Sequence, residues 1–285
     1  MIDFYIVDVF AQQKFTGNQV AVLKSDSPLT NEEMLKIAKE MKFIQSCFLI
    51  KDNDSYQVRI FMPKLEIPFS GDPVLASAFI INQIINEAPE ESILIKLQNG
   101  VVEIQHQDDT YWMESPQPIF GRIFDKILLS RVLSIEPEDI CDNPPIQQVS
   151  IGVPYIIVPI KNMKTLREIS INKERYEWLT QRTKASCVLA YCNESIDEGN
   201  DYHIRVFADA LGIPEDPASG SGVGSLAAYL SRYISSAEEG FQIRVEQGYE
   251  IGRPSLIKAK IHQLTEFLQI AIGGKVKLTS QGKIL

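Results

Sequence analysis

The chain has 285 residues, enough for one large domain or two ordinary ones with a substantial buried core. Hydrophobic residues make up 45% and charged residues 23%, which is the balance of a globular protein and not of a disordered one. The net charge of -9, without any basic run, argues against nucleic acid and anionic membranes as partners and leaves a small molecule or a second copy of the chain.

The start of the chain and its apolar runs predict a cytoplasmic protein. The first residues enter a strand-like run with no basic segment or cleavage site, and no apolar stretch is long enough to span a bilayer. The four cysteines fit no zinc spacing and are too few for a disulfide scaffold. We therefore expect the cysteines to be reduced thiols. The three histidines are scattered along the chain, so we expect no metal centre.

The first part of the chain predicts strands and two helices. A helix begins at residue 31, because Thr30 is a suitable N-cap and Glu33 completes a capping box. A second helix opened by Asp72 is apolar on most faces, so we expect it inside a curled sheet. Runs of β-branched and aromatic residues predict strands at residues 2–10, 20–23, 47–50, 57–61, 93–97 and 101–106.

Two prolines within residues 115–118 break any regular element and mark the boundary between two lobes. We assign residues 1–116 to the N-terminal lobe and residues 117–285 to the C-terminal lobe, with the extreme C-terminus free to pack back on the first lobe. Shortly after the boundary, a helix is predicted at residues 125–133.

The second lobe repeats the first in the same order, which predicts two diverged copies of one unit. The matching segments are residues 17–22 with 152–157, 46–49 with 186–189, 58–61 with 204–207, 67–68 with 213–214, 69–72 with 218–221, and 95–100 with 243–248. In this alignment the second copy has three extra residues after Pro214. The predicted fold class is α/β (α+β): two pseudo-symmetric lobes, each a curled, mostly antiparallel sheet around a central helix.

Both central helices begin at a glycine turn, at Gly71 and at Gly220, and present unpaired backbone N–H groups there. Such helix ends attract anions, and in a pseudo-twofold pair both can face one cleft, a natural site for a small carboxylate. Asp72 and Ser221 occupy equivalent positions at these two ends. The alternative is that both residues are ordinary helix caps.

Two carboxylates, Glu215 and Asp216, stand just before the second glycine turn. A carboxylate held in a cleft acts as a general acid or base if its pKa is tuned. The alternative is an acidic loop with an ordinary cap.

Three segments resemble the signatures of the PhzF-like isomerases, the family named for phenazine biosynthesis. Residues 7–18 contain VDVF and FTGN, which are similar to the opening signature of the family. Residues 215–221 (EDPASGS) resemble its central E-D-P-x-T-G-S motif, and residues 247–255 (QGYEIGRPS) resemble its late Q-G-x-x-x-G-R-P-S motif.

The resemblance implies the diaminopimelate-epimerase-like fold, with the active site between the lobes. It also implies cofactor-free isomerisation by proton transfer on a small carboxylate-bearing substrate, and a homodimer. By the same resemblance Gly17 and Asn18 shape a turn near the cleft. Arg253 either binds a substrate carboxylate or makes a structural pair.

Two positions depart from the family pattern. Gln45 stands where the family has the glutamate base of an N-x-x-E-T-x-F stretch, and an amide cannot take up and return a proton at neutral pH. Asp72, followed by Pro73, stands where the family has the histidine of G-H-P or G-H-A. Asp216 and Ser221 match the family motif.

Three hypotheses follow for function. In the first, which we favour, Asp72 replaces the lost base, Asp216 polarises the substrate, and Ser221 and Gln45 orient it. In the second, the chain is a catalytically impaired pseudoenzyme or a small-molecule binding protein. In the third, Cys47 and Cys187, paired by the repeat, transfer protons as in two-thiol epimerases, although buried inert thiols fit their strand-like surroundings better.

Overall fold

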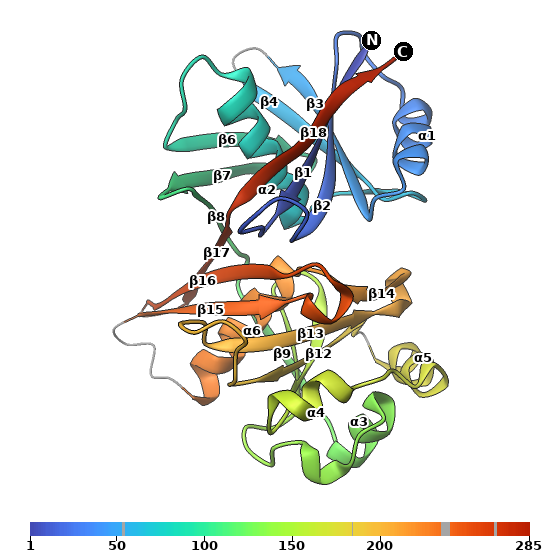
Figure 1. Ribbon diagram of the computed structural model, residues 1–285, viewed down its shortest axis with the longest axis vertical. Helices are drawn as coiled ribbons and strands as arrows, with labels where there is room; N and C mark the ends of the chain where they lie inside the picture. The colour runs from blue at the N-terminus through green and yellow to red at the C-terminus, as the bar shows by residue number, and fades with distance from the viewer. Residues whose placement is uncertain (53–54, 184, 235–239, 265–266) are drawn as a thin grey trace. The chain divides into compact units, whose positions relative to one another are not determined.

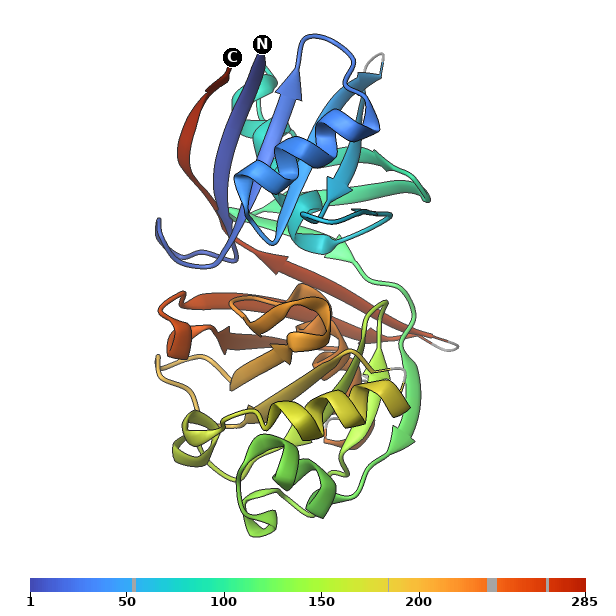
Figure 2. The ribbon, with the colours of Figure 1, turned by 90° about the vertical axis from the view of Figure 1, so that its right-hand side faces the viewer.

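The computed structural model describes residues 1–52, 55–183, 185–234, 240–264 and 267–285, and the chain divides into two compact units (Figure 1). Unit 1 contains Met1–Glu114 and Gly273–Leu285, and unit 2 contains Ser115–Ile272. The division falls two residues before the boundary expected from the prolines. The C-terminal segment belongs to unit 1, where the two chain ends lie beside each other in both views (Figures 1 and 2).

Unit 1 is a curled sheet that encloses one helix, α2 (Gly71–Ile80). Most residues of α2 are buried, and the helix contacts strands on several sides, as predicted from its apolar sequence. A π-helical turn, η1 (Ile81–Ile85), continues α2. The strands are β1 (Ile2–Val9), β2 (Asn18–Ser25), β3 (Gln45–Asp52), β4 (Ser55–Phe61), β5 (Glu66–Ile67), β6 (Ser92–Leu97), β7 (Gly100–Gln107), β8 (Thr110–Glu114) and β18 (Val276–Ile284).

A second helix, α1 (Asn31–Met41), packs on the outer face of unit 1 (Figure 2). Its predicted capping box is confirmed: Thr30 accepts from the backbone N–H of Glu33, and the Glu33 carboxylate accepts from the backbone N–H of Thr30. The buried side of α1 joins a cluster with Phe48 and Phe61, whose rings meet edge to face at 5.4 Å.

Unit 2 has the same plan around α6 (Gly220–Tyr233), which contacts β10, β11 and β16. Its other helices, α3 (Lys126–Leu133), α4 (Met163–Glu168) and α5 (Lys173–Arg182), cover a second apolar cluster. Its strands are β9 (Ile119–Ile123), β10 (Gln147–Ser150), β11 (Pro154–Pro159), β12 (Cys187–Cys192), β13 (Tyr202–Ala208), β14 (Ile213–Asp216), β15 (Phe241–Gln247), β16 (Ser255–Gln263) and β17 (Leu268–Gly274), at whose end the chain passes to unit 1.

The strand pairings of the two units correspond one to one. In unit 1, β1–β2, β3–β4 and β6–β7 are antiparallel, and β2–β3 and β4–β6 are parallel. In unit 2, β10–β11, β12–β13 and β15–β16 are antiparallel, and β11–β12 and β13–β15 are parallel. β18 extends the first sheet beside β1 as β9 extends the second beside β10. The predicted fold of two copies, each a mostly antiparallel sheet around a helix, is confirmed.

The strand registers correct one match of the predicted repeat. Cys47 lies between Val22 on β2 and Ile60 on β4. In unit 2 the counterpart of Val22 is Ile157 and the counterpart of Ile60 is Val206. The residue that lies between these two is Leu189. The sequence alignment of residues 46–49 with 186–189 was therefore wrong by two residues. Because side chains alternate with a period of two, this slip keeps the same face of the strand and was hard to detect from sequence. The register makes Cys187, and not Ala185, the counterpart of Gln45.

An ion pair that occurs in both units corrects a second match. Arg59 binds both carboxylate oxygens of Glu66 at 2.8 and 2.5 Å, and Arg205 binds those of Glu215 at 2.9 and 2.8 Å. Residues 66–72 (EIPFSGD) thus correspond to residues 215–221 (EDPASGS) without a gap. The three extra residues of unit 2 lie earlier than expected, between β13 and the glutamate.

The buried Arg205 is expected to contribute more to stability than Arg59. Its side chain is 9% exposed against 20% for Arg59, and it also donates to the carbonyls of Leu166, Arg167 and Ile169. Arg205→Ala should lower the free energy of unfolding in urea by about 3 kcal/mol, because it leaves Glu215 and these carbonyls unpaired. Arg59→Ala is the matched control, with a loss of about 1 kcal/mol. Equal losses would contradict this assignment.

Candidate functional site

A buried carboxylate lies in the first turn of α2. The Asp72 side chain is 8% exposed, and its Oδ2 accepts a hydrogen bond of 2.6 Å from Nδ2 of Asn18, which is 4% exposed. Burial raises the pKa of Asp72 from its ordinary value of 3.8 to about 6, although the hydrogen bonds from Asn18 and from the backbone lower it. The carboxylate therefore changes its charge close to neutral pH.

Gly17 fixes the position of Asn18. It has a φ of +70°, and a Cβ atom there would lie 2.2 Å from the carbonyl oxygen of Val9. This close approach ends the loop and starts β2 with Asn18 directly opposite Val9. The turn expected from the family resemblance is therefore present, and it aims the Asn18 amide at the Asp72 carboxylate.

Gln45, at the start of β3, meets the same helix end. Its Oε1 accepts a hydrogen bond of 2.9 Å from Ser70 Oγ, and Ser70 is the N-cap residue of α2. Ser70 does not cap the helix with its side chain, and its hydroxyl donates to Gln45 instead. Gly71 and Pro73 complete the first turn, where the missing N–H of proline costs nothing. Unit 1 thus brings the predicted residues Gly17, Asn18, Gln45, Gly71, Asp72 and Pro73 to one helix N-terminus.

The corresponding helix end in unit 2 carries three hydroxyl groups, with Ser221 at the position of Asp72. Ser219 caps α6 by accepting from the backbone N–H of Gly222 at 3.2 Å. The Tyr155 hydroxyl lies 2.9 Å from Ser219 Oγ and 2.6 Å from Ser221 Oγ. Burial raises the pKa of Tyr155 well above its ordinary range, so the phenol is neutral. Ser221 is thus a partner of Tyr155, as Asp72 is of Asn18.

The two carboxylates before α6 have different environments. Glu215 is held by Arg205, as described above. Asp216 Oδ1 accepts from the backbone N–H of Ala218 at 3.3 Å. Burial is the main cause of the raised pKa of Cys187 and of Tyr155, and the charge of Asp216 adds to it. Glu215 is thus engaged in the ion pair with Arg205, whereas Asp216 bonds to the backbone of the turn before α6.

Gln247 at the end of β15 holds the motif in place. Its Oε1 accepts from the backbone N–H of Ser219 at 3.0 Å, and its Nε2 donates to the carbonyl oxygen of Asp216 at 2.6 Å. At the next residue, Gly248, a Cβ atom would lie 2.5 Å from the carbonyl oxygen of Pro217 and 2.4 Å from that of Arg253. This packing brings the late motif, with Arg253, against the central motif with Asp216 and Gly220.

A buried histidine braces the turn that leads to Arg253. His203 is fully buried, with Nδ1 at 3.0 Å from Glu246 and Nε2 at 3.1 Å from Glu250. Burial lowers the pKa of His203, but the two carboxylates overcome this effect and raise it. Glu246 also accepts hydrogen bonds from the backbone N–H groups of Ile196 and Asp197 and from the Asn200 amide. Burial raises the pKa of Glu246, but these hydrogen bonds and the one from His203 lower it to about 2. The network ties β13, β15 and the turn at Tyr249–Ile251 together.

The cysteines lack the surroundings of catalytic thiols. Burial raises the pKa of Cys47 and of Cys187 to about 12 each, so both are neutral near pH 7. Cys47 Sγ lies 3.2 Å from Ser77 Oγ inside unit 1. Within the described residues there is no group of three metal-ligating side chains, and no helix is long and apolar enough to cross a membrane.

Sequence reasoning missed three residues of these sites. Tyr155 lies in the repeated segment 152–157, for which the sequence predicts no site role, although a hydroxyl inside the apolar run of β11 is a signal. Gln247 was noted as a motif letter without a role, and only its contacts in the fold show that role. The sequence predicts no role for His203, because no other histidine stands near it. Its partners are glutamates that follow it by more than 40 residues.

Two sheet-enclosed helices, each with polar groups gathered at its N-terminus, define a protein of the diaminopimelate-epimerase-like fold. A model of the family described as phenazine biosynthesis-like protein (PhzC-PhzF) matches residues 7–282, and the chain belongs to this family. This confirms the resemblance found in the sequence motifs.

Relatives and solved structures agree with this assignment. The chain is 29% identical to an uncharacterised isomerase of Clostridium acetobutylicum, over 99% of this chain and 98% of that protein. It is 27% identical to trans-2,3-dihydro-3-hydroxyanthranilate isomerase of Pseudomonas chlororaphis, over the whole of both chains. The crystal structure of a PhzF-family protein of Bacillus anthracis has a TM-score of 0.93 and 25% identity, covering 100% of this chain and 99% of that one. Isomerase is the class of activity that this membership supports.

The raised pKa of Asp72 predicts a pH dependence of stability. Between pH values of about 4 and 6 the carboxyl ionises in the unfolded chain but stays protonated in the folded one. The folded state binds more protons there, so stability falls as pH rises through this window, by up to about 3 kcal/mol. Near pH 4 the free energy of unfolding of Asp72→Asn should equal that of the wild type. Near neutral pH the variant should be the more stable protein, because its amide carries no charge. Urea unfolding at several pH values measures this.

The exposed Asp26 supplies the control for this measurement. Its side chain is 71% exposed, so Asp26→Asn should leave the pH dependence of stability unchanged. Identical curves for wild type and Asp72→Asn would contradict the raised pKa.

Proposed function

We propose that the chain is a cofactor-independent isomerase that moves a proton between two carbon atoms of a small carboxylate-bearing substrate. One observation carries this proposal: Asp72 is a buried carboxylate at a helix N-terminus, with a pKa of about 6. We further propose a cytoplasmic homodimer, as the family resemblance implies.

Asp72 acts as the base in this proposal. The carboxylate takes a proton from a substrate carbon, the electron pair of the C–H bond moves into an adjacent unsaturated system, and the proton returns to a second carbon. A base works best when its pKa lies near the working pH, and burial brings Asp72 close to that value. The sequence posed an obstacle, since a helix N-terminus favours the charged carboxylate and lowers its basicity. The raised pKa supports burial as the larger effect.

The other residues bind and orient the substrate. Asp216 polarises the reacting group, and Ser221 donates or accepts through its hydroxyl, supported by Tyr155. Gln45 cannot transfer a proton, but its Nε2 group remains a donor because its Oε1 is taken by Ser70. The backbone N–H groups at the starts of α2 and α6 attract the substrate carboxylate, as does Arg253.

A second candidate function is a catalytically impaired protein that still binds a small carboxylate. The observation that favours it is the amide of Gln45 in the position of the family glutamate, engaged with Ser70. The cysteine mechanism has less support, because both thiols are buried and neutral and the strand registers do not pair them.

The proposed isomerase is tested in deuterium oxide. Wild-type protein is mixed with trans-2,3-dihydro-3-hydroxyanthranilate and related amino acids, and deuterium in the substrate and product is followed by mass spectrometry. We expect exchange at carbon that rises with pH through about 6, as Asp72 loses its proton. Asp72→Asn should lower the rate by about 10² to 10⁴ fold, the usual contribution of a general base, while Asp26→Asn should not.

Gln45→Glu separates the two candidate functions. If the wild type exchanges no proton and Gln45→Glu does, the scaffold is intact and the binding-protein alternative holds. If neither protein exchanges deuterium with any substrate while the Asp72 pH dependence of stability is present, the proposal that Asp72 is a base is wrong.

A further inference from the structure

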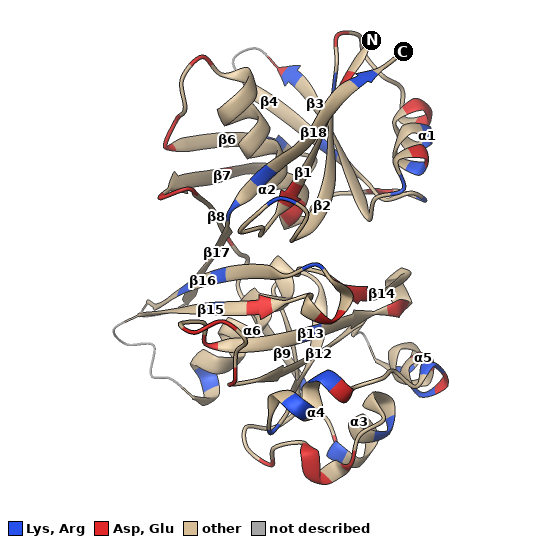
Figure 3. Cartoon of the chain, viewed as in Figure 1, with Lys and Arg blue, Asp and Glu red and all other residues tan. Residues whose placement is uncertain are grey.

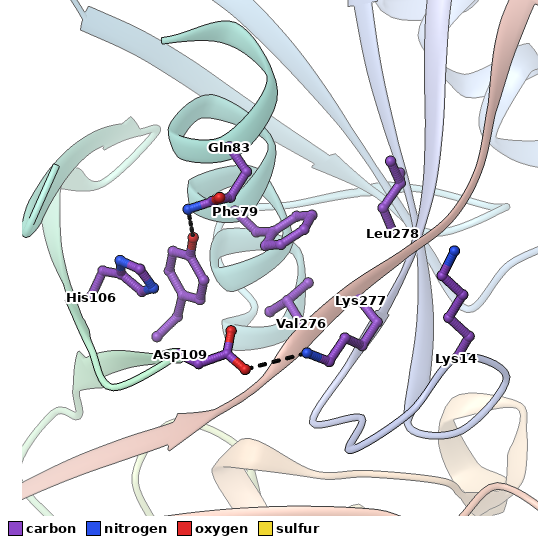
Figure 4. A pocket seen from close by; sticks show the side chains of 9 residues that line it. Lys14, Phe79, Gln83, His106, Asp109, Val276, Lys277 and Leu278 are labelled. Carbon is purple, nitrogen blue, oxygen red and sulfur yellow. Dashed lines mark hydrogen bonds and ion pairs between the residues drawn. The ribbon is translucent and has the colours of Figure 1, made fainter. Parts of the chain in front are cut away.

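Unit 1 has a cavity of about 330 Å³ at the far end of α2 from Asp72 (Figure 4). Phe79 of α2 and Gln83 of the π-helical turn η1 line it, which are seven and eleven residues beyond Asp72. At a rise of about 1.5 Å per residue, Phe79 lies roughly 10 Å along the axis from Asp72. The remaining lining residues are Lys14, His106, Asp109, Tyr111, Val276, Lys277 and Leu278. The volume is in the range of small-molecule sites.

Positive charge gathers at this cavity on a chain that is negative overall. Lys277, on β18, and Lys14, in the loop between β1 and β2, both line it. Lysine and arginine positions are visible along β18 in Figure 3. Asp109 is the acidic residue of the lining, and both Lys275 at 3.0 Å and Lys277 at 3.3 Å bind it. Lys14 forms no ion pair with any described residue. The two lining lysines exceed the one lining carboxylate by one positive charge, and Lys275 beside Asp109 adds a second, which favours an anion.

One wall of the cavity is aromatic. The ring of Tyr111 is edge to face with Phe79 at 5.9 Å and stacked with His106 at 4.5 Å. The Tyr111 hydroxyl accepts from Gln83 Nε2 at 3.3 Å, a contact drawn in Figure 4, and this contact draws the Gln83 amide toward the aromatic wall. Gln83 belongs to a π-helical turn, an irregularity that is frequent at functional sites.

The second unit lacks these features at the equivalent place. Counted from Gly71 and Gly220, Arg232 is the counterpart of Gln83, and the strand registers make Phe120 the counterpart of Leu278. Arg232 lies over the Phe120 ring at 4.3 Å, and α6 continues as a regular α-helix through this position. In unit 2 an arginine and a large ring thus occupy the region that is open in unit 1. The shared fold thus accommodates a filled arrangement at this place and does not by itself require the open one.

We propose that this cavity binds a small organic anion with a flat ring. Lys14 and Lys277 face the anionic group, and the half-buried rings of Phe79 and His106, which both contact the buried Tyr111, pack against the flat ring. The site is separate from Asp72 and does not depend on the proposed isomerase activity.

Benzoate is the probe for this site, because it combines one carboxylate with a flat ring. Cyclohexanecarboxylate has the same charge without the flat ring, and inorganic phosphate has charge alone. Binding is followed by the ring signals of the three histidines in NMR spectra, with His106→Gln used for assignment. Only His106 lines the cavity. We expect benzoate to shift the His106 signal to saturation and to leave those of His203 and His262 in place.

Two variants and one control test the contacts. Lys277→Gln should weaken benzoate binding roughly tenfold, by loss of one ionic contact. Leu278→Phe, which installs the residue of the other unit, should weaken it by filling the cavity. Lys283→Gln, on the same strand but paired with Asp3 at 3.6 Å, should bind benzoate like the wild type.

Three results would overturn the proposal. An unmoved His106 signal at millimolar benzoate would exclude the site. Equal affinity for cyclohexanecarboxylate or phosphate would exclude recognition of a flat ring. Equal weakening by Lys283→Gln would show that general surface charge, and not this cavity, attracts the anion.

Discussion

The enclosure of a helix by a curled sheet is the constraint on which the other features depend. When strands pack on several sides of α2, its side chains must be small or apolar, and nearly all of them are buried. The start of the helix is then a natural place for polar groups, because the first N–H groups have no partner inside the helix. The same constraint acts on α6. It concentrates Asp72 with Asn18 in one unit and Ser219, Ser221 and Tyr155 in the other. It also explains why a carboxylate at this place is poorly hydrated and holds its proton to higher pH.

The two copies share their framework and differ in their polar groups. The Arg–Glu pairs beside β4 and β13 have the same geometry, and both arginines lie over a phenylalanine two residues further on. At the helix ends, however, Asp72 corresponds to Ser221, Gln45 to Cys187, and Ile67 to Asp216. Each unit therefore has one carboxylate near its helix end, at different positions of the same motif. A symmetric scaffold has become chemically asymmetric without a change of topology.

The sequence predicted the two-copy fold, the central helices and the capping box, because repeats, hydrophobic patterns and caps are local signals. It did not predict the register of Cys187, since a slip of two residues leaves the buried face of a strand unchanged. It identified Asn18 and Asp72 separately, but their hydrogen bond joins residues 54 positions apart and depends on the curl of the sheet. The raised pKa of Asp72 could not be predicted either, because the helix end and burial act in opposite directions and only packing decides between them.

Each unit is completed by an edge strand that stands next to the other unit in the sequence, and this order has a consequence for biosynthesis. β9 follows the last strands of the first copy in the chain but pairs with β10, and β18 follows the last strands of the second copy but pairs with β1. As the chain leaves the ribosome from its N-terminus, unit 1 is synthesised first and yet lacks its β18 neighbour until all of unit 2 has emerged. The β1 edge of the nascent protein is unpaired during that interval. β9 is the first strand of unit 2 to be translated, so all strands of unit 2 are present as soon as β17 has been made. The unit that is translated second can therefore be the first to finish folding.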